Sequence, residues 1–109
     1  MARAARIMEI LQDMVHIDSE TNTPKERQME SYLQHFLSHL DGVVSGLIHV
    51  PDDTCQRSVV YGLVRGSTAH TVIFMNHHDV VDVETYGYLR DQAFDPQGLY
   101  KALERASRQ

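Results

Sequence analysis

The stretch that decides the fold runs from Thr71 to Asp82, TVIFMNHHDVVD. Its first five residues, 71–75, are mostly apolar, with β-branched and aromatic side chains at the centre, which is typical of a buried β-strand. The polar run NHHD at residues 76–79 then ends the apolar stretch abruptly. We therefore expect a buried strand that delivers two imidazoles and a carboxylate to its carboxyl end, where open α/β sheets place their ligand crevices.

The order of residues in this polar run predicts which side chains act together. Successive side chains of a strand point to opposite faces, so His77 and Asp79 share one face while His78 points to the other. Histidine is the commonest side-chain metal ligand near neutral pH, and a neighbouring carboxylate fixes its tautomer. The pattern predicts His77 as a metal ligand and Asp79 as the catalytic-site carboxylate that orients it.

A purely structural role is the alternative for the same residues. The adjacent histidines would then satisfy backbone groups, and Asp79 would cap a turn. A zinc site usually needs three or four protein ligands, and one histidine with one carboxylate does not complete it. The remaining nearby candidates are Asp82, Glu84 and Asp91, and none of them has compelling spacing.

Composition and charge narrow the class of protein. The 109 residues make one domain or part of one, and the apolar share of 42% and charged share of 23% are ordinary for a soluble globular protein. The formal charge of −5 argues against a nucleic-acid surface. Cys55 is the single cysteine, which excludes an internal disulfide and suits a reducing compartment. No apolar stretch approaches the length of a bilayer span, so we expect a cytoplasmic protein without a membrane partner.

Two helices are expected before the first strand. The first carries an apolar stripe at helical spacing, made of Ile7, Ile10, Leu11, Met14 and Val15. The second has the signals of a helix start in Thr23 as N-cap, Pro24 at the first helical position and Glu26 closing a capping box. Its inward side chains are expected to be Met29, Leu33, Phe36, Leu37 and Leu40, and Asp41-Gly42 ends it.

His35 and His39 are four residues apart on the second helix, a spacing that can chelate a metal. They fall opposite the apolar stripe, and no acidic residue stands beside them in the manner of a zinc-protease helix. We interpret them as solvated surface histidines.

The second half of the chain is expected to alternate strands and loops before a last helix. Strands are predicted over residues 46–50 and 58–64, and the short connection 65–70 favours an antiparallel hairpin between 58–64 and 71–75. Residues 84–88 are expected to form a loop. Asp95 as N-cap and Pro96 at the first helical position then begin the last helix.

The order of these features resembles the co-catalytic zinc peptidases and amidohydrolases of the aminoacylase and carboxypeptidase type. The segments that carry the resemblance are ILQDMVHIDSET, TPKERQMESYLQHFL, the strand RSVVYG at residues 57–62 and TVIFMNHHDVV. The stretch HHDVVDVETYGYLRDQAFDPQGL is most similar to a branch of arginine-utilisation peptidase-like proteins. The resemblance covers residues 1–109 but only the beginning of the family's catalytic domain.

The resemblance implies an α/β fold of three layers, with a mixed sheet flanked by helices. It implies that residues 1–109 form a single partial catalytic domain without the lid or dimerisation domain. His77 then matches a ligand of one of two zinc ions, and Asp79 matches the aspartate that orients it. The substrate would be a peptide or acyl-amino acid, hydrolysed by the intact enzyme. Asn76 departs from the small residue usual there, and the remaining metal ligands and the general base have no match in this chain.

Three readings of the function remain open at this point. The first is the N-terminal part of a zinc-dependent peptidase or amidohydrolase, inactive by itself. The second is a truncated, non-catalytic module that associates with itself or with a partner through exposed apolar surface. The third is a weak metal-binding module that uses His77 with His78 or Asp82.

Overall fold

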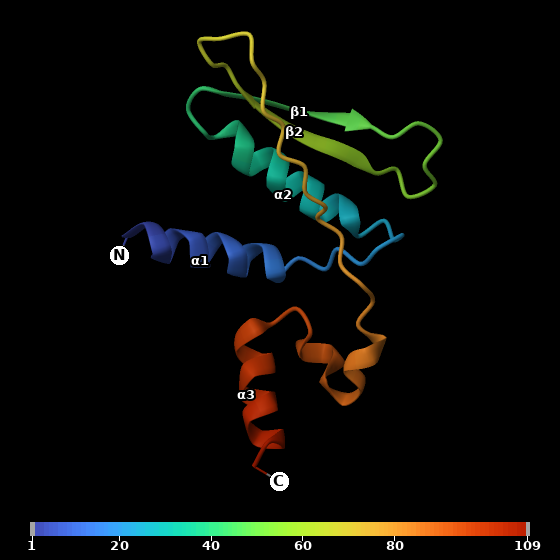
Figure 1. Cartoon of the computed structure of the whole chain (residues 1–109). Helices are drawn as coiled ribbons and strands as arrows, with labels where there is room; N and C mark the ends of the chain where they lie inside the picture. Colours follow the sequence, from blue (N-terminus) through green and yellow to red (C-terminus); the bar gives the residue numbers. More distant parts are fainter. Residues whose placement is uncertain (1, 109) are drawn as a thin grey trace.

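The computed structural model describes residues 2–108 and contains helices and a small sheet. The elements in chain order are α1 (Ala2–Val15), α2 (Glu26–Ser38), β1 (Val43–His49), β2 (Ser58–Val64), the 3-10 helix η1 (Glu84–Gln92) and α3 (Pro96–Ala106) (Figure 1). The predicted α/β class is confirmed. The residues of the predicted apolar stripe all lie within α1, and β2 spans residues 58–64 as predicted.

The sheet consists of β1 and β2, which pair antiparallel from Val43 opposite Val64 to His49 opposite Ser58. α2 packs on this hairpin, as Figure 1 shows. The approach is close at Gly62, where a Cβ atom would lie 3.2 Å from a methyl carbon of Leu37. Glycine at this position therefore lets the helix settle against the strand.

Residues 71–75 are not a strand, and this prediction is wrong. Within residues 2–108, β2 pairs only with β1, so the predicted hairpin between 58–64 and 71–75 is also wrong, and the mixed three-layer sheet is not seen there. The physical reason is that this segment lacks a hydrogen-bonding neighbour: no backbone group of residues 71–76 is bonded within the described part of the chain. β1 and β2 have such a neighbour in each other, and Asp53 stabilises the loop between them by accepting hydrogen bonds from the backbone and the guanidinium of Arg57 at 2.6 to 3.0 Å.

The predicted capping of α2 is wrong in its position: the N-cap is Lys25 instead of Thr23, no side chain caps the helix, and the helix begins two residues later than expected. The Glu26 carboxylate accepts the backbone N–H of Asn22 at 2.7 Å, and the Thr23 hydroxyl accepts that of Lys25 at 3.3 Å. Pro24 lies in a preceding turn with hydrogen bonds of the i to i+3 type, so α2 starts at Glu26. The tighter turn satisfies backbone groups that a regular helix start leaves open.

The C-terminal part also differs from the expectation at one place. Residues 84–88, predicted as a loop, belong to the 3-10 helix η1, which is kinked at Gly87 with φ of +55°. Asp95 and Pro96 begin α3 as predicted, although the Asp95 side chain makes no capping hydrogen bond.

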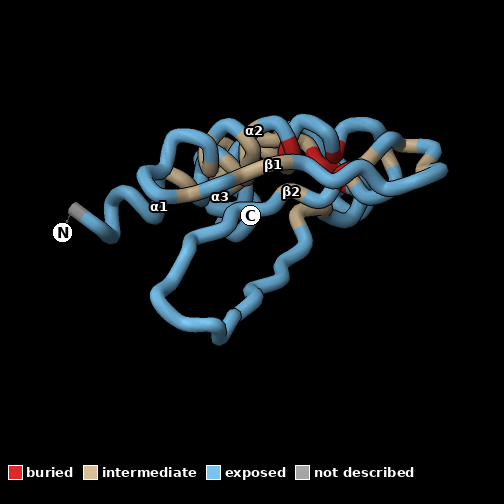
Figure 2. The backbone as a smooth tube through the Cα atoms, turned by 90° about the horizontal axis from the view of Figure 1, so that it is seen from above, coloured by how far each residue is buried: buried red, intermediate tan, exposed pale blue. Residues whose placement is uncertain are grey.

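The core is small for a chain of this length. Met29 and Val83 are the buried apolar residues among those described, and every residue from 61 to 77 is exposed. Figure 2 shows this as a long pale loop that leaves the body of the molecule. The radius of gyration is 17.3 Å, against about 13 Å for a compact domain of this length. None of the helices in the described part is long and apolar enough to cross a membrane.

Candidate functional site

The backbone around the two predicted site residues is held by a segment near the N-terminus. Val80 donates its N–H to the carbonyl of Ser19 at 3.0 Å, and Thr21 donates its N–H to the carbonyl of Val80 at 2.8 Å. The fully buried Ser19 hydroxyl also donates to the carbonyl of His78 at 2.9 Å. These bonds form one parallel bridge between residues 20 and 80. The position of residues 77–80 is therefore fixed by pairing with residues almost sixty positions earlier.

His77 and Asp79 lie side by side, as the alternation of side chains predicts. The His77 Nδ1 atom is 3.3 Å from Asp79 Oδ1 and 3.1 Å from the Asp79 carbonyl oxygen. The His77 side chain is 86% exposed. A proton on Nδ1 would be shared with these two oxygens, which leaves the Nε2 lone pair for another ligand.

The Asp79 carboxylate has a second partner that holds it in place. The Thr21 hydroxyl donates to Asp79 Oδ2 at 2.6 Å, and the side chain of Asp79 is 34% exposed. This hydrogen bond is the main cause that lowers the pKa of Asp79 below its usual value, and the neighbouring His77 lowers it further. Asp79 is therefore ionised near neutral pH, with Oδ2 bonded to Thr21 and Oδ1 facing His77.

His78 has a different environment from His77. It is half-buried, and its Nδ1 atom is enclosed without a hydrogen-bond partner in the described part of the chain. The side chains of His77 and Asp79 thus contact each other, while the Nδ1 atom of His78 is buried in the protein.

The pair opens on a groove between the segment 74–79 and the packed unit of α2 and β2. This groove has a volume of about 590 Å³. Its lining includes apolar side chains such as Leu33 and Leu37 and the buried Glu26. The groove thus combines apolar side chains with a few polar groups, as small-molecule sites usually do.

The other candidate ligands are engaged elsewhere or lie apart. Asp82 accepts the backbone N–H of Glu84 at 2.9 Å, and Glu84 pairs with Arg90 at 2.9 Å. His35 on α2 and His39 at its C-cap are exposed as predicted, with ring centroids 4.3 Å apart. Across residues 2–108, no group of three or more His, Cys, Asp or Glu side chains is placed to hold a metal ion.

Sequence reasoning missed Ser19 and Thr21, which support the site. The stretch Asp18-Ser19-Glu20-Thr21 reads as a turn, and turn formation is also typical of these residue types. The only signal in the sequence was that Ser19 and Thr21 carry hydroxyl groups that could donate hydrogen bonds to the site. Their partners lie 58 and 59 residues away, so only the fold identifies them.

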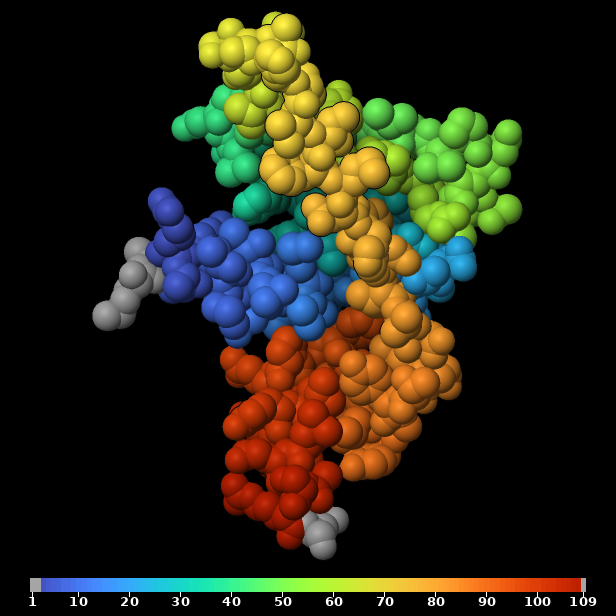
Figure 3. All heavy atoms as spheres, in the orientation of Figure 1, coloured from blue at the N-terminus to red at the C-terminus, as the bar shows by residue number. Residues whose placement is uncertain are grey.

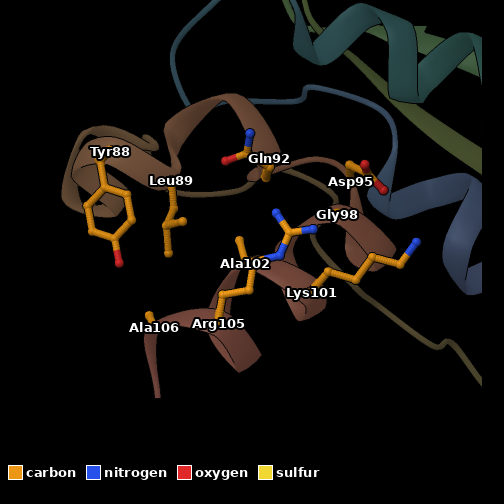
Figure 4. Close-up of a pocket in the computed structure, with 9 residues that line it drawn as sticks. All are labelled: Tyr88, Leu89, Gln92, Asp95, Gly98, Lys101, Ala102, Arg105 and Ala106. Carbon is orange, nitrogen blue, oxygen red and sulfur yellow. The ribbon is translucent and has the colours of Figure 1, made fainter. Parts of the chain in front are cut away.

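A second hollow lies apart from these residues, between η1 and α3. It has a volume of about 770 Å³, and its lining includes Tyr88, Gln92, Lys101 and Arg105. Figure 4 shows the Arg105 guanidinium turned toward η1 while Lys101 extends away from it. None of the predicted site residues lines this hollow.

Comparison with known proteins gives two relatives. The chain is 25% identical over 112 residues to Protein RocB of Bacillus subtilis (strain 168), which covers 96% of this chain and 20% of that protein. It is 31% identical over 105 residues to Uncharacterized protein YqjN of the same strain, covering 89% of this chain and 18% of that protein. No family model and no solved structure matches.

These similarities indicate a distant relationship to Protein RocB. The chain spans about a fifth of the length of the curated relatives that it matches.

Proposed function

We propose that this chain contributes a histidine ligand and its orienting carboxylate to the metal site of a zinc-dependent peptidase or amidohydrolase. The substrate class is a peptide or an acyl-amino acid. The proposal is supported by the resemblance of the sequence to the co-catalytic zinc hydrolases and by the distant relationship to Protein RocB. The observation that carries it is the contact between His77 Nδ1 and Asp79 Oδ1 at 3.3 Å.

The chemistry of this pair fits one half of a zinc site. Histidines that bind zinc usually donate their other ring N–H to a carboxylate or a carbonyl, which fixes the tautomer and the ring orientation. Both kinds of acceptor lie beside Nδ1 of His77, from the side chain and the backbone of Asp79. Nε2 is then the metal-binding nitrogen, on a side chain that is exposed.

The protein residues around this pair have distinct roles in the proposed reaction. Zinc held by Nε2 of His77 would supply a bound water of lowered pKa and a positive charge beside the amide carbonyl. Asp79 holds the proton on Nδ1, and Thr21 keeps Asp79 ionised and oriented. The groove beside α2 and β2 would receive the apolar part of the substrate.

One ligand with its orienter is insufficient for hydrolysis. A general base must reach the attacking water, and two metal ions need several ligands to hold them about 3.5–4 Å apart. No such ligand group exists among residues 2–108. We therefore expect the chain alone, with added zinc, to show no amide hydrolysis above background.

The test is zinc binding, followed by NMR of the histidine side chains. Because His35 and His39 could chelate zinc on their own, both are first replaced by alanine. In that background, added Zn²⁺ should shift the His77 ring resonances with Nε2 as the coordinated nitrogen. Asp79→Asn should weaken the binding about 10-fold or more, as loss of an orienting carboxylate typically does.

His77→Ala in the same background removes the proposed ligand, and His49→Ala is the matched control on β1. Zinc binding that persists in His77→Ala, or that His49→Ala removes equally, would contradict the proposal. So would a His77 ring that carries its proton on Nε2 before zinc is added.

A second candidate function is a folded interaction module without catalysis. The exposed apolar residues of the segment 71–75 favour it, since monomeric soluble proteins rarely expose a contiguous apolar patch of this kind. The zinc titration separates the two functions, because only the first requires a metal-bound His77.

A further inference from the structure

The backbone that carries His77 and Asp79 is held on one side only. No backbone group of residues 71–76 has a hydrogen-bond partner in the described part of the chain. From residue 78 onward, the backbone is bonded to the connection between α1 and α2, at residues 16–25. Figure 3 shows this blue N-terminal part of the chain against the orange segment around residue 80. The position of the proposed metal ligand therefore depends on the contacts of this connection.

Glu20 makes the contact that reaches farthest along the segment. It stands opposite Val80 in the parallel bridge, between Ser19 and Thr21, which make the hydrogen bonds described above. The Glu20 carboxylate extends beyond the bridge, where its Oε1 atom accepts the backbone N–H of Val83 at 3.2 Å. The segment after the site is thus attached at a second point, three residues past the first.

The Glu20 carboxylate has a second partner, which constrains it less. Its Oε2 atom lies 2.9 Å from the amine of Lys25, which is also 2.6 Å from Asp18 Oδ2. The Lys25 amine ends a flexible side chain that is 46% exposed, and ion pairs open to water hold their partners weakly. Val83 donates from the backbone and is 8% exposed, and the Glu20 side chain is 14% exposed. The bond to Val83 therefore joins two well-fixed groups.

We propose that Glu20 is a positioning residue for His77 and Asp79. By accepting the N–H of Val83, it fixes the backbone that follows Asp79 at a second point beyond the bridge at Val80. Two points of attachment set the direction of a segment, whereas one point leaves it free to turn. The effect on metal binding rests on the proposed function, but the positioning itself is measurable without metal.

A purely local role of Glu20 is the alternative. Val83 is the N-cap of η1, so the same hydrogen bond also stabilises the start of that helix. If its role ended there, replacing Glu20 would loosen η1 and leave the backbone at Val80 unchanged. The Val80 N–H distinguishes the two roles, because its acceptor is the carbonyl of Ser19, which no substitution of Glu20 removes.

The first measurement is NMR-detected hydrogen exchange of the full chain without metal. Glu20→Ala should speed exchange of the Val80 N–H about 10-fold, as loss of a hydrogen bond to a charged group would. Glu20→Gln keeps an acceptor of the same reach and should recover most of the protection. Glu20→Asp keeps the charge beside Lys25 but is too short for Val83, and should act as Glu20→Ala does. Glu9→Ala is the matched control, because it removes an exposed carboxylate of α1 that pairs with a base at 2.7 Å.

The second measurement is the zinc affinity of His77 in the background that lacks His35 and His39. Glu20→Ala and Glu20→Asp should each raise the dissociation constant about 10-fold, the lower end of the effect for residues that support a metal ligand. Glu20→Gln and Glu9→Ala should stay close to the value of the parent. A role in stability alone would lower the urea midpoint of Glu20→Ala without this change in affinity. Circular dichroism checks that each variant keeps its helices.

The two measurements fail separately. Val80 exchange that Glu20→Ala and Glu20→Asp leave unchanged, or that Glu9→Ala speeds equally, would overturn the positioning role whether or not zinc binds. Exchange as fast in Glu20→Gln as in Glu20→Ala would overturn the assignment to the Val83 hydrogen bond. A parent that binds no zinc through His77 would contradict the proposed function alone, and the exchange rates would still decide the role of Glu20.

Discussion

The unit of α2, β1 and β2 and the segment 71–75 are both rich in apolar residues, but only the first is packed. In the unit, the helix lies against both strands, and the buried Glu30 carboxylate accepts the N–H of Ser58 at 2.8 Å. In the segment, apolar side chains are exposed and the backbone has no partner. The comparison shows that a strand depends on a neighbour as much as on its own composition.

The largest effect on the free energy of unfolding is expected at Met29, the buried apolar residue of the packed unit. Met29→Ala should lower the free energy of unfolding by about 2–5 kcal/mol, because it leaves a cavity under α2. Met8→Ala makes the same change on α1, where the side chain is 52% exposed, and should cost about 0.5 kcal/mol or less. Urea unfolding of both variants measures the difference. Equal losses would mean that the unit has no distinct core.

A smaller effect is expected from the buried hydrogen bond between α2 and β2. Glu30→Ala leaves the N–H of Ser58 buried without an acceptor and should cost about 1–3 kcal/mol. Glu30→Gln keeps an acceptor oxygen of the same reach and should recover most of this loss. If both variants unfold at the same urea concentration, the N–H of Ser58 is satisfied by another group.

The same unit shows why some features were predictable from sequence. Residues 58–64 are rich in β-branched residues and are flanked by turn residues, and the strand forms because the loop 50–57 brings β1 beside it. Residues 71–75 have an equally strong local pattern, but their pairing depends on a neighbour that sequence periodicity cannot reveal. The contact between His77 and Asp79 was predictable from alternation over two residues. Thr21 was not, because its partner lies 58 positions away.

The loop that closes the hairpin should make the unit sensitive to acid. Hydrogen bonds from Arg57 lower the pKa of Asp53 from 3.8 to about 2. A folded-state pKa below the unfolded one means that ionised Asp53 stabilises the fold above pH 4, and this contribution is lost as the pH falls toward 2. The gap between the urea midpoints of the wild type and Asp53→Asn should therefore close between pH 4 and pH 2. A gap that is constant over this range would contradict the assignment.

The smallest effect is expected at Thr21, whose hydroxyl acts on the pKa of Asp79. The Thr21 hydroxyl oxygen lies 2.6 Å from Asp79 Oδ2 and 2.8 Å from the carbonyl oxygen of Val80, so its single proton is shared between the carboxylate and the backbone bridge at Val80. Thr21→Val should raise the pKa of Asp79 toward its usual value, because the hydroxyl is the main cause of its lowering. Thr21→Ser keeps the hydroxyl and should leave that pKa low, as a carbon-13 NMR titration of the carboxyl would show.

An equal pKa of Asp79 in Thr21→Val and Thr21→Ser would mean that His77 alone holds the carboxylate in its ionised form. The two substitutions therefore separate the supports of Asp79. If Thr21 dominates, the carboxylate is oriented by the connection between α1 and α2 before any metal binds, and His77 is free to turn its Nε2 atom outward. If His77 dominates, the orientation is set within the exposed segment itself, and covering residues 71–75 would then change the pKa of Asp79.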